Sequence, residues 1–251
     1  MDVLSAAIGL SVSVAVMLAV ALLRRKEAIT FGAVLGMFLL GCAIGIPVAL
    51  IERALLGEGG SGLLTFGHAL VVGVCEELEK GLLALPFILR TRRRTGGSLM
   101  QIDGIMCCMV TAAGFSFLEN ACYLSMGYTP HMRALASLGH VTYGVIIGAA
   151  IVRALNAKGR GDKVGALRHA IGGFALAVVL HAVWDSGVFT GLSSLFYSSP
   201  FYHLWSIPVI GPLLITIGGY SGIVLTYLFW AFVACYGIWY AVREYRLSRQ
   251  L

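Results

Sequence analysis

Charged residues are scarce in this chain. They make up 12% of its 251 residues, whereas about a quarter of the residues of a water-soluble domain are charged. Hydrophobic residues make up 59%, and long apolar runs recur along nearly the whole sequence. Each run is near the roughly 20 residues that a helix needs to cross a bilayer. The composition therefore excludes a soluble protein and indicates a polytopic integral membrane protein.

Several sequence signals of other protein classes are also missing. The six cysteines lie in apolar stretches and form no C-x-x-C pair, so neither a zinc ribbon nor a disulfide framework is indicated. The sequence contains no serine nucleophile elbow, H-E-x-x-H helix motif, P-loop or Rossmann fingerprint. The net charge of +6 does not indicate nucleic acid as a partner, because the basic residues form short clusters between apolar runs.

The apolar runs predict an all-α bundle of about seven spanning helices that forms a single membrane domain over residues 1–251. The predicted spans are 4–23, 28–51, 65–89, 102–125, 137–155, 170–190 and 221–242. An eighth stretch, 205–219, contains Pro208, Gly211 and Pro212, which interrupt a spanning helix. We therefore expect that stretch to be re-entrant or interfacial. Three G-x-x-x-G pairs allow close helix contact within the bundle: Gly32/Gly36, Gly41/Gly45 and Gly144/Gly148.

The basic residues predict the orientation of the spans. With seven spans and the N-terminus outside, fifteen of the 18 Lys and Arg residues face the cytoplasm, as the positive-inside rule requires. Arg53 and Arg133 fall in outer segments, and Lys80 falls within a span. We therefore expect a protein of the cell membrane with its N-terminus outside and its C-terminus in the cytoplasm.

Four consecutive predicted spans carry ionisable residues. Such a group costs at least about 2.5–3.5 kcal/mol near the bilayer centre, and it marks a functional site by default. Helix rise places these groups toward the outer half of the membrane, so we expect them to meet in one polar cavity there. The residues are Glu76, Glu77, Glu79 and Lys80 in the third span, Glu119 in the fourth, His140 in the fifth, and His181 and Asp185 in the sixth.

Helical spacing suggests which groups of the third span act together. Glu76 and Lys80 are four residues apart and share a face, so Lys80 can hold Glu76 ionised, which favours Glu76 as the primary carboxylate. Glu79 shares that face and is the other candidate partner of Lys80. Glu77 is turned by about 100° from Glu76. We therefore expect that the two carboxylates cannot both point straight at one atom.

Buried carboxylates and imidazoles suit hydrolysis, and the sequence leaves two mechanisms open. In the first, a glutamate takes a proton from water and returns it to the leaving amine, while an imidazole donates to the oxyanion, aided by Asn120. In the second, zinc activates the water and is bound by Glu119, His140 and His181. Asn120 has a simpler alternative role, which is a hydrogen bond between helices.

The motifs resemble those of the PrsW family of intramembrane proteases, which is distantly similar to the CAAX prenyl endopeptidase clan. They are E-E-x-x-K at 76–80, F-x-x-x-E-N at 115–120, H-x-x-x-G at 140–144 and H-x-x-x-D at 181–185. The resemblance covers about residues 65–190, the predicted catalytic core. It implies that Glu76 activates water, with Glu77 as its motif neighbour. Glu119 stands where CAAX relatives have a histidine.

The resemblance also implies a class of substrate, namely single-pass membrane proteins such as anti-sigma-type regulators. Outside this class, a proton-coupled transporter or channel could use the same buried Glu, His and Lys residues. Transporters commonly contain inverted repeats with paired broken helices, and the sequence contains no such repeat. The aromatic 189–219 region predicts either an interfacial belt or a cover over the site. We expect cleavage to occur near the outer membrane boundary.

Overall fold

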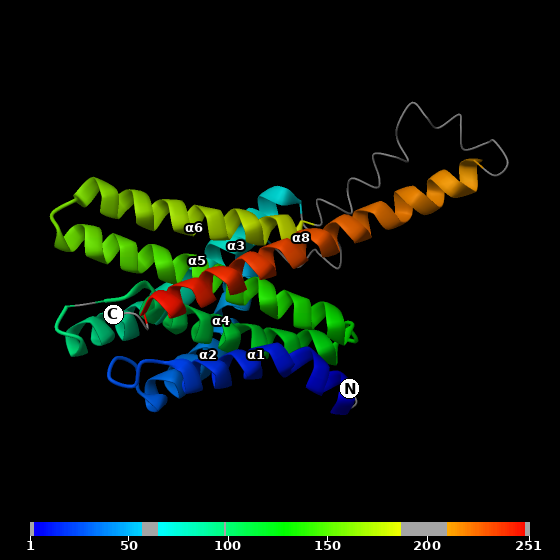
Figure 1. Ribbon diagram of the computed structural model, residues 1–251. Helices are drawn as coiled ribbons and strands as arrows, with labels where there is room; N and C mark the ends of the chain where they lie inside the picture. The colour runs from blue at the N-terminus through cyan, green and yellow to red at the C-terminus, as the bar shows by residue number, and fades with distance from the viewer. Residues whose placement is uncertain (1–2, 57–64, 98, 187–209, 249–251) are drawn as a thin grey trace.

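The computed structural model describes residues 3–56, 65–97, 99–186 and 210–248. These residues form seven helices and no strand, as the all-α prediction requires. The helices lie side by side in one elongated bundle (Figure 1). They are α1 (Val3–Leu23), α2 (Phe31–Leu56), α3 (Phe66–Arg94), α4 (Gln101–Ser125), α5 (Pro130–Gly159), α6 (Lys163–Asp185) and α8 (Ile210–Ser248).

Five of these helices are long and apolar enough to cross a membrane on their own, namely α1, α2, α4, α5 and α6. Helix α3 is 29 residues long, but the charged residues of the candidate site lower its hydropathy. The chain is therefore an integral membrane protein, and the full number of seven spans stays a prediction.

Helix α8 differs from the sequence prediction. Residues 210–219 were expected in a separate broken segment, but they begin the same 39-residue helix that contains residues 221–242. Pro212 is the third residue of α8, and in the first turn a proline removes no helical hydrogen bond. At 1.5 Å per residue α8 is about 58 Å long, against a hydrocarbon core of about 30 Å. Its N-terminal part extends beyond the other helices (Figure 1). Residues 189–209, which hold most of the predicted cover, lie outside the described residues.

Helix α4 occupies the centre of the bundle, where it packs against α1, α2, α3, α5 and α8. Glycines allow its backbone to approach two neighbours closely. A methyl group added at Gly114 would meet the carbonyl of Phe38 in α2, and one added at Gly148 in α5 would meet the carbonyl of Gly104. The pairs at 41/45 and 144/148 thus lie at helix contacts, whereas Gly32 faces open space.

The two ends of the bundle differ in charge. The basic clusters lie where α1, α3, α5 and α8 end and α6 begins, on the left in Figure 1. The α1–α2 loop is held there by Arg25, whose guanidinium lies 3.1 Å from carboxylate oxygens of both Glu27 and Asp103. A backbone hydrogen bond and the Arg25 side chain lower the pKa of Glu27 from its ordinary value. We call this side the basic end of the bundle.

Candidate active site

Helix α3 carries the centre of the site. It begins at Thr65, whose hydroxyl caps the helix by accepting from the backbone N–H of His68. About four turns later, the Lys80 ammonium lies 2.8 Å from Glu76 Oε2 and 2.9 Å from Glu77 Oε1. All three side chains are buried. The expected pairing of Glu76 with Lys80 is therefore present.

Two expectations for this helix are wrong. Glu76 and Glu77 both point at one atom, the Lys80 ammonium, although their Cβ atoms are turned by about 100°. The reason is the length of the glutamate side chain, whose rotatable bonds carry each carboxylate around the helix surface. Glu79 is not the partner of Lys80, and its buried Oε2 has no hydrogen bond among the described residues.

Lys80 also joins α3 to α4 and α5. Its Nζ lies 2.9 Å from Nδ1 of His140 and 4.0 Å from the centre of the Phe115 ring. An ammonium group can only donate hydrogen bonds, so Nδ1 of His140 accepts and Nε2 carries the proton. Nε2 lies 2.8 Å from Glu119 Oε2, to which it donates. Phe115 of the F-x-x-x-E-N motif thus packs against the Lys80 ammonium of the E-E-x-x-K motif.

Helix α6 closes the site from the other side. His181 Nδ1 lies 2.9 Å from Glu77 Oε1, and its Nε2 lies 3.2 Å from Asp185 Oδ2. The same Nε2 is 3.7 Å from Glu76 Oε2, and the imidazole ring stacks on Tyr143 with ring centres 5.2 Å apart. A methyl group at Gly73 would be 3.4 Å from Cβ of His181. The small residue therefore lets α6 approach α3 closely enough for these contacts.

Asn120 is engaged in helix packing. Its amide nitrogen lies within 3.0 Å of the Gly9 carbonyl, the Arg133 carbonyl and the Ser137 hydroxyl. Its carbonyl oxygen accepts from Arg133 Nε at 2.7 Å. The side chain is buried and joins α1, α4 and α5. This geometry favours the simpler of the two roles considered for Asn120 and leaves no free donor for an oxyanion.

Sequence reasoning missed two charged residues near the site. Arg133, placed in an outer loop, is buried in α5 and lies 3.0 Å from Glu119. It precedes His140 by seven residues, which is two helical turns, and that spacing could have revealed it. Glu52 of α2 lies within electrostatic range of Glu76. Its buried Oε1 has no hydrogen bond among the described residues, and no motif signals it.

The site residues fit a divalent metal ion in type and separation. One ligand atom from each of Glu76, Glu77, His140 and His181 lies within 4.8 Å of the others, and carboxylate and imidazole are zinc ligands. Glu77 Oε2 is buried and has no hydrogen bond within the part of the chain that the structure describes. Because the Lys80 ammonium already contacts three of the four groups, a metal ion would have to take its place.

Glu119, a predicted metal ligand, is not part of that group. Its Oε2 is bonded to Nε2 of His140, on the opposite side of the ring from Nδ1, which faces Lys80. The arrangement suits a residue that orients His140. The catalytic roles expected for Glu76, Glu77, Glu119, His140, His181 and Asp185 stay predictions, although the structure brings all six together.

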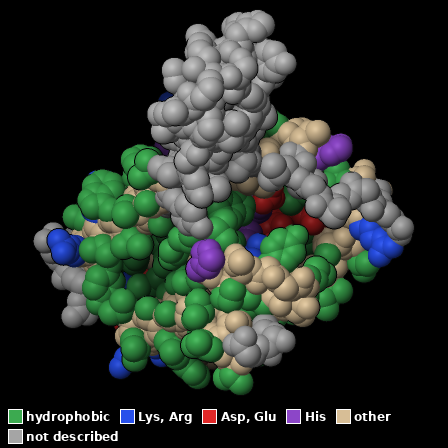
Figure 2. All heavy atoms as spheres, turned by 90° about the vertical axis from the view of Figure 1, so that its right-hand side faces the viewer, with side chains coloured by type: hydrophobic (Ala, Val, Ile, Leu, Met, Phe, Trp, Pro, Cys, Tyr) green, Lys and Arg blue, Asp and Glu red, His purple; other side chains and the backbone are tan. Residues whose placement is uncertain are grey.

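The site is reached from the end of the bundle opposite the basic end. Asp185 is the last residue of α6, and the side chains of Glu119 and Asp185 are each 22% exposed. Figure 2 shows that end, where acidic side chains gather in a hollow. Water therefore has access to the outer members of the polar network.

Comparison with protein families identifies the class of this chain. A family described as PrsW family intramembrane metalloprotease matches residues 30–212. The chain therefore belongs to the PrsW family, and it is an intramembrane protease, a hydrolase that acts in the lipid bilayer. The transporter alternative is not favoured. Comparison with curated proteins and with solved structures gives no match.

Proposed function

We propose that this protein hydrolyses a peptide bond of a single-pass membrane protein with a water molecule that Glu76 activates. One observation carries this assignment. Glu76 Oε2 lies 2.8 Å from the Lys80 ammonium and 3.7 Å from His181 Nε2, while its other oxygen has no hydrogen bond among the described residues. An ionised carboxylate with a free oxygen beside an imidazole is suited to accept a proton from water.

The proposed reaction uses Glu76 first as a base and then as an acid. The carboxylate takes a proton from water as the oxygen attacks the peptide carbonyl, and the carbonyl oxygen becomes an oxyanion. An N–H of His181 or Lys80 stabilises that charge after it turns from its present partner toward the substrate oxygen. Glu76 then gives its proton to the leaving nitrogen as the C–N bond breaks. The products are a new carboxyl terminus and a new amino terminus.

The other charged groups hold this arrangement. Glu77 and Asp185 lie within hydrogen-bond distance of the two nitrogens of His181 and so fix its ring. Glu119 fixes His140 in the same way and is itself paired with Arg133. If a metal ion is bound by Glu76, Glu77, His140 and His181, it supplies Lewis acidity and lowers the pKa of bound water to about 7.

The proposed substrates are anti-sigma-type regulators of the cell membrane. Glu76 is the eleventh residue of α3, about 15 Å from the outer end of that helix at 1.5 Å per residue. The basic end supports an orientation with the N-terminus outside. This depth is close to mid-membrane, but the site opens at the opposite end from the basic clusters, where Glu119 and Asp185 are partly exposed. Cleavage is therefore proposed on the outer side of the membrane centre, toward the outer boundary of the substrate.

Reconstituted protein and candidate single-pass peptides test the proposal. Glu76→Gln should lower the cleavage rate by about 10²–10⁴-fold, the range of general acid–base catalysis. Glu27→Gln, an exposed glutamate of the α1–α2 loop, is the matched control and should cleave normally. Wild-type cleavage by Glu76→Gln would refute the assignment, and cleavage products cut on the cytoplasmic side would refute the proposed position.

Metal analysis of the same preparations decides between the two mechanisms. Loss of activity together with bound zinc after chelation would support the zinc mechanism, in which Glu76, Glu77, His140 and His181 hold the ion in place of the Lys80 ammonium. Full activity of protein that holds no metal after chelation would eliminate the zinc mechanism and leave Glu76 to act alone.

A further inference from the structure

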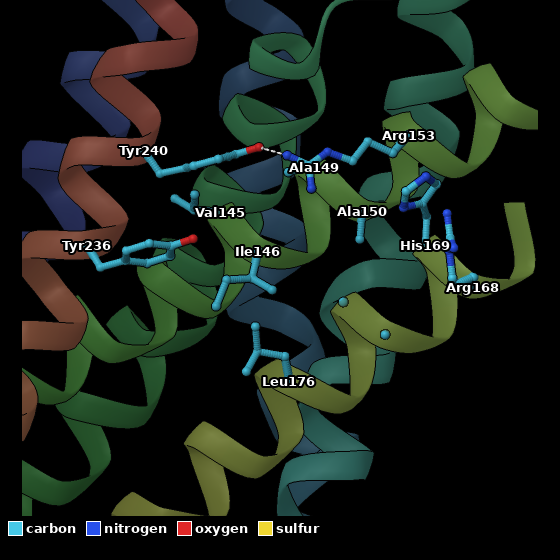
Figure 3. A pocket seen from close by; sticks show the side chains of 12 residues that line it. Val145, Ile146, Ala149, Ala150, Arg153, Arg168, His169, Leu176, Tyr236 and Tyr240 are labelled. Carbon is cyan, nitrogen blue, oxygen red and sulfur yellow. Dashed lines mark hydrogen bonds between the residues drawn. The ribbon is translucent and has the colours of Figure 1, made fainter. Parts of the chain in front are cut away.

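A second cavity lies between α5, α6 and α8, away from the candidate active site. Its volume is about 270 Å³. Arg168 and His169 lie on one side of it, Arg153 reaches across it to Tyr240, and apolar side chains of α5 and α6 line the space between (Figure 3). The basic side chains are Arg153, Arg168 and His169, and the apolar ones include Val145, Ile146 and Leu176. The cavity therefore offers basic groups for a headgroup and an apolar surface for an acyl chain, as a lipid ligand requires.

No described carboxylate forms an ion pair with Arg153 or Arg168, although Glu244 of α8 lies within electrostatic range of Tyr240. Arg153 donates a hydrogen bond to the hydroxyl of Tyr240, which in turn donates to Gln101. These partners are neutral, so they position the guanidinium without cancelling its charge. Arg168 is exposed and forms no ion pair in the described chain. The nearby carboxylate of Asp162 caps α6 by accepting from the Gly165 N–H.

The shape of the cavity depends on two adjacent glycines of α6. A methyl group at Gly173 would meet the side chain of Ala150, so this residue sets the close contact of α6 with α5. A methyl group at Gly172 would meet nothing within 4 Å. The missing side chain at Gly172 therefore keeps the cavity open, and a larger residue there can fill it without disturbing the helix contact.

We propose that this cavity binds an anionic phospholipid of the leaflet at the basic end. The phosphate contacts Arg153 and Arg168, and an acyl chain runs along Val145, Ile146 and Leu176. Arginine is well suited to phosphate, and basic pockets between transmembrane helices bind such headgroups. In this arrangement the cavity takes the headgroup, and the acyl chain continues along exposed Leu176.

A lipid fits this cavity better than a free phosphate ion does. Half of the lining is apolar, and it lies on helices that are long and apolar enough to span the membrane. A phosphate ion would leave that half without a partner. The site also lies at the end where the positive-inside rule places the cytoplasmic leaflet, whose surface is negative.

Native mass spectrometry of the full chain tests the proposal directly. Detergent-purified protein is titrated with phosphatidylglycerol, with zwitterionic phosphatidylcholine of the same chains, or with inorganic phosphate. We expect a 1:1 complex with phosphatidylglycerol that phosphatidylcholine does not form and that millimolar phosphate does not displace. Equal binding of the two lipids, or displacement by phosphate alone, would overturn the proposal.

Two variants locate the complex. Arg168→Gln should weaken phosphatidylglycerol binding about tenfold, since a hydrogen bond to a charged group contributes about 1.5–3 kcal/mol. Gly172→Leu should abolish it by filling the apolar half. The matched controls are Arg160→Gln, an exposed arginine at the same end, and Gly32→Leu, a helical glycine that also faces open space. Unchanged binding in both cavity variants would overturn the assignment, and this readout does not depend on proteolytic activity.

Discussion

Lys80 is the residue on which the polar groups of the site converge. Its three N–H groups face Glu76, Glu77 and His140, and it is almost fully buried. Lys80→Met removes the counter-charge of two carboxylates in low dielectric. Breaking a buried ion pair in this way costs about 3–5 kcal/mol. We expect a large fall in the thermal unfolding midpoint of the purified protein and loss of peptide cleavage.

A second substitution separates charge from packing at Lys80. The double variant Lys80→Met/Glu77→Gln carries one uncompensated carboxylate fewer, so part of the lost stability should return. Lys163→Met, at an exposed position, is the matched control for loss of a lysine. Unfolding of Lys80→Met at the wild-type temperature would contradict the central role of the ammonium.

Asn120 allows a test of whether its amide acts on the substrate or on the fold. Asn120→Ala removes hydrogen bonds that join α1, α4 and α5, and leaving such groups unpaired costs about 1–3 kcal/mol. We expect a lower unfolding temperature but less than a tenfold change in kcat of the folded fraction. Loss of an oxyanion donor would instead lower kcat by about 10²–10³-fold, and that result would restore the catalytic role.

The sequence predicts the site best where spacing within one helix decides the contact. Glu76 and Lys80, four residues apart, are paired as expected. Contacts between helices depend on rotation and depth, which one sequence does not contain. Arg133 precedes the apolar run of its span and was read as a loop residue, although α5 begins at Pro130 and buries it. Glu52 belongs to no motif, and only the packing of α2 brings it near the other charges.

The contact between α4 and α5 is set by glycine. A methyl group at Gly148 would lie 2.6–2.8 Å from backbone atoms of Gly104 and Ile105, and backbone cannot move aside without shifting a helix. Gly148→Ala should therefore destabilise the protein by about 1–3 kcal/mol, as overpacking does. Thermal unfolding in detergent measures this, with Gly32→Ala, where the added methyl meets nothing, as the control. Equal midpoints for the two variants would show that the helices separate easily.

Helix α8 shows why proline and glycine residues alone do not predict where a helix is interrupted. Pro212 and the glycines around it indicated a break, because these residues are poor in a helix interior. The chain begins its helix at Ile210, which turns the same proline into a first-turn residue. The position of a proline relative to the helix start decides its effect, and a sequence pattern does not fix that start.

At the scale of the whole molecule, the two sites lie at different depths. The candidate active site opens at the end where α4 and α6 finish and α5 begins, whereas Arg153 and Arg168 lie toward the basic end. This separation places the proposed hydrolysis in one half of the bilayer and the proposed lipid in the other. A substrate helix can therefore approach the candidate active site while a lipid remains bound.

The basic end of the bundle predicts how the bundle is oriented in the membrane. If the basic end faces the cytoplasm, Lys158 is inside and Met126, which is 71% exposed, is outside. In a background without the six native cysteines, Met126→Cys should react with an impermeant maleimide added to intact cells. Lys158→Cys should react only after the membrane is opened. The reverse pattern would place the candidate active site in the inner half of the bilayer, and cleavage near the outer boundary would then be wrong.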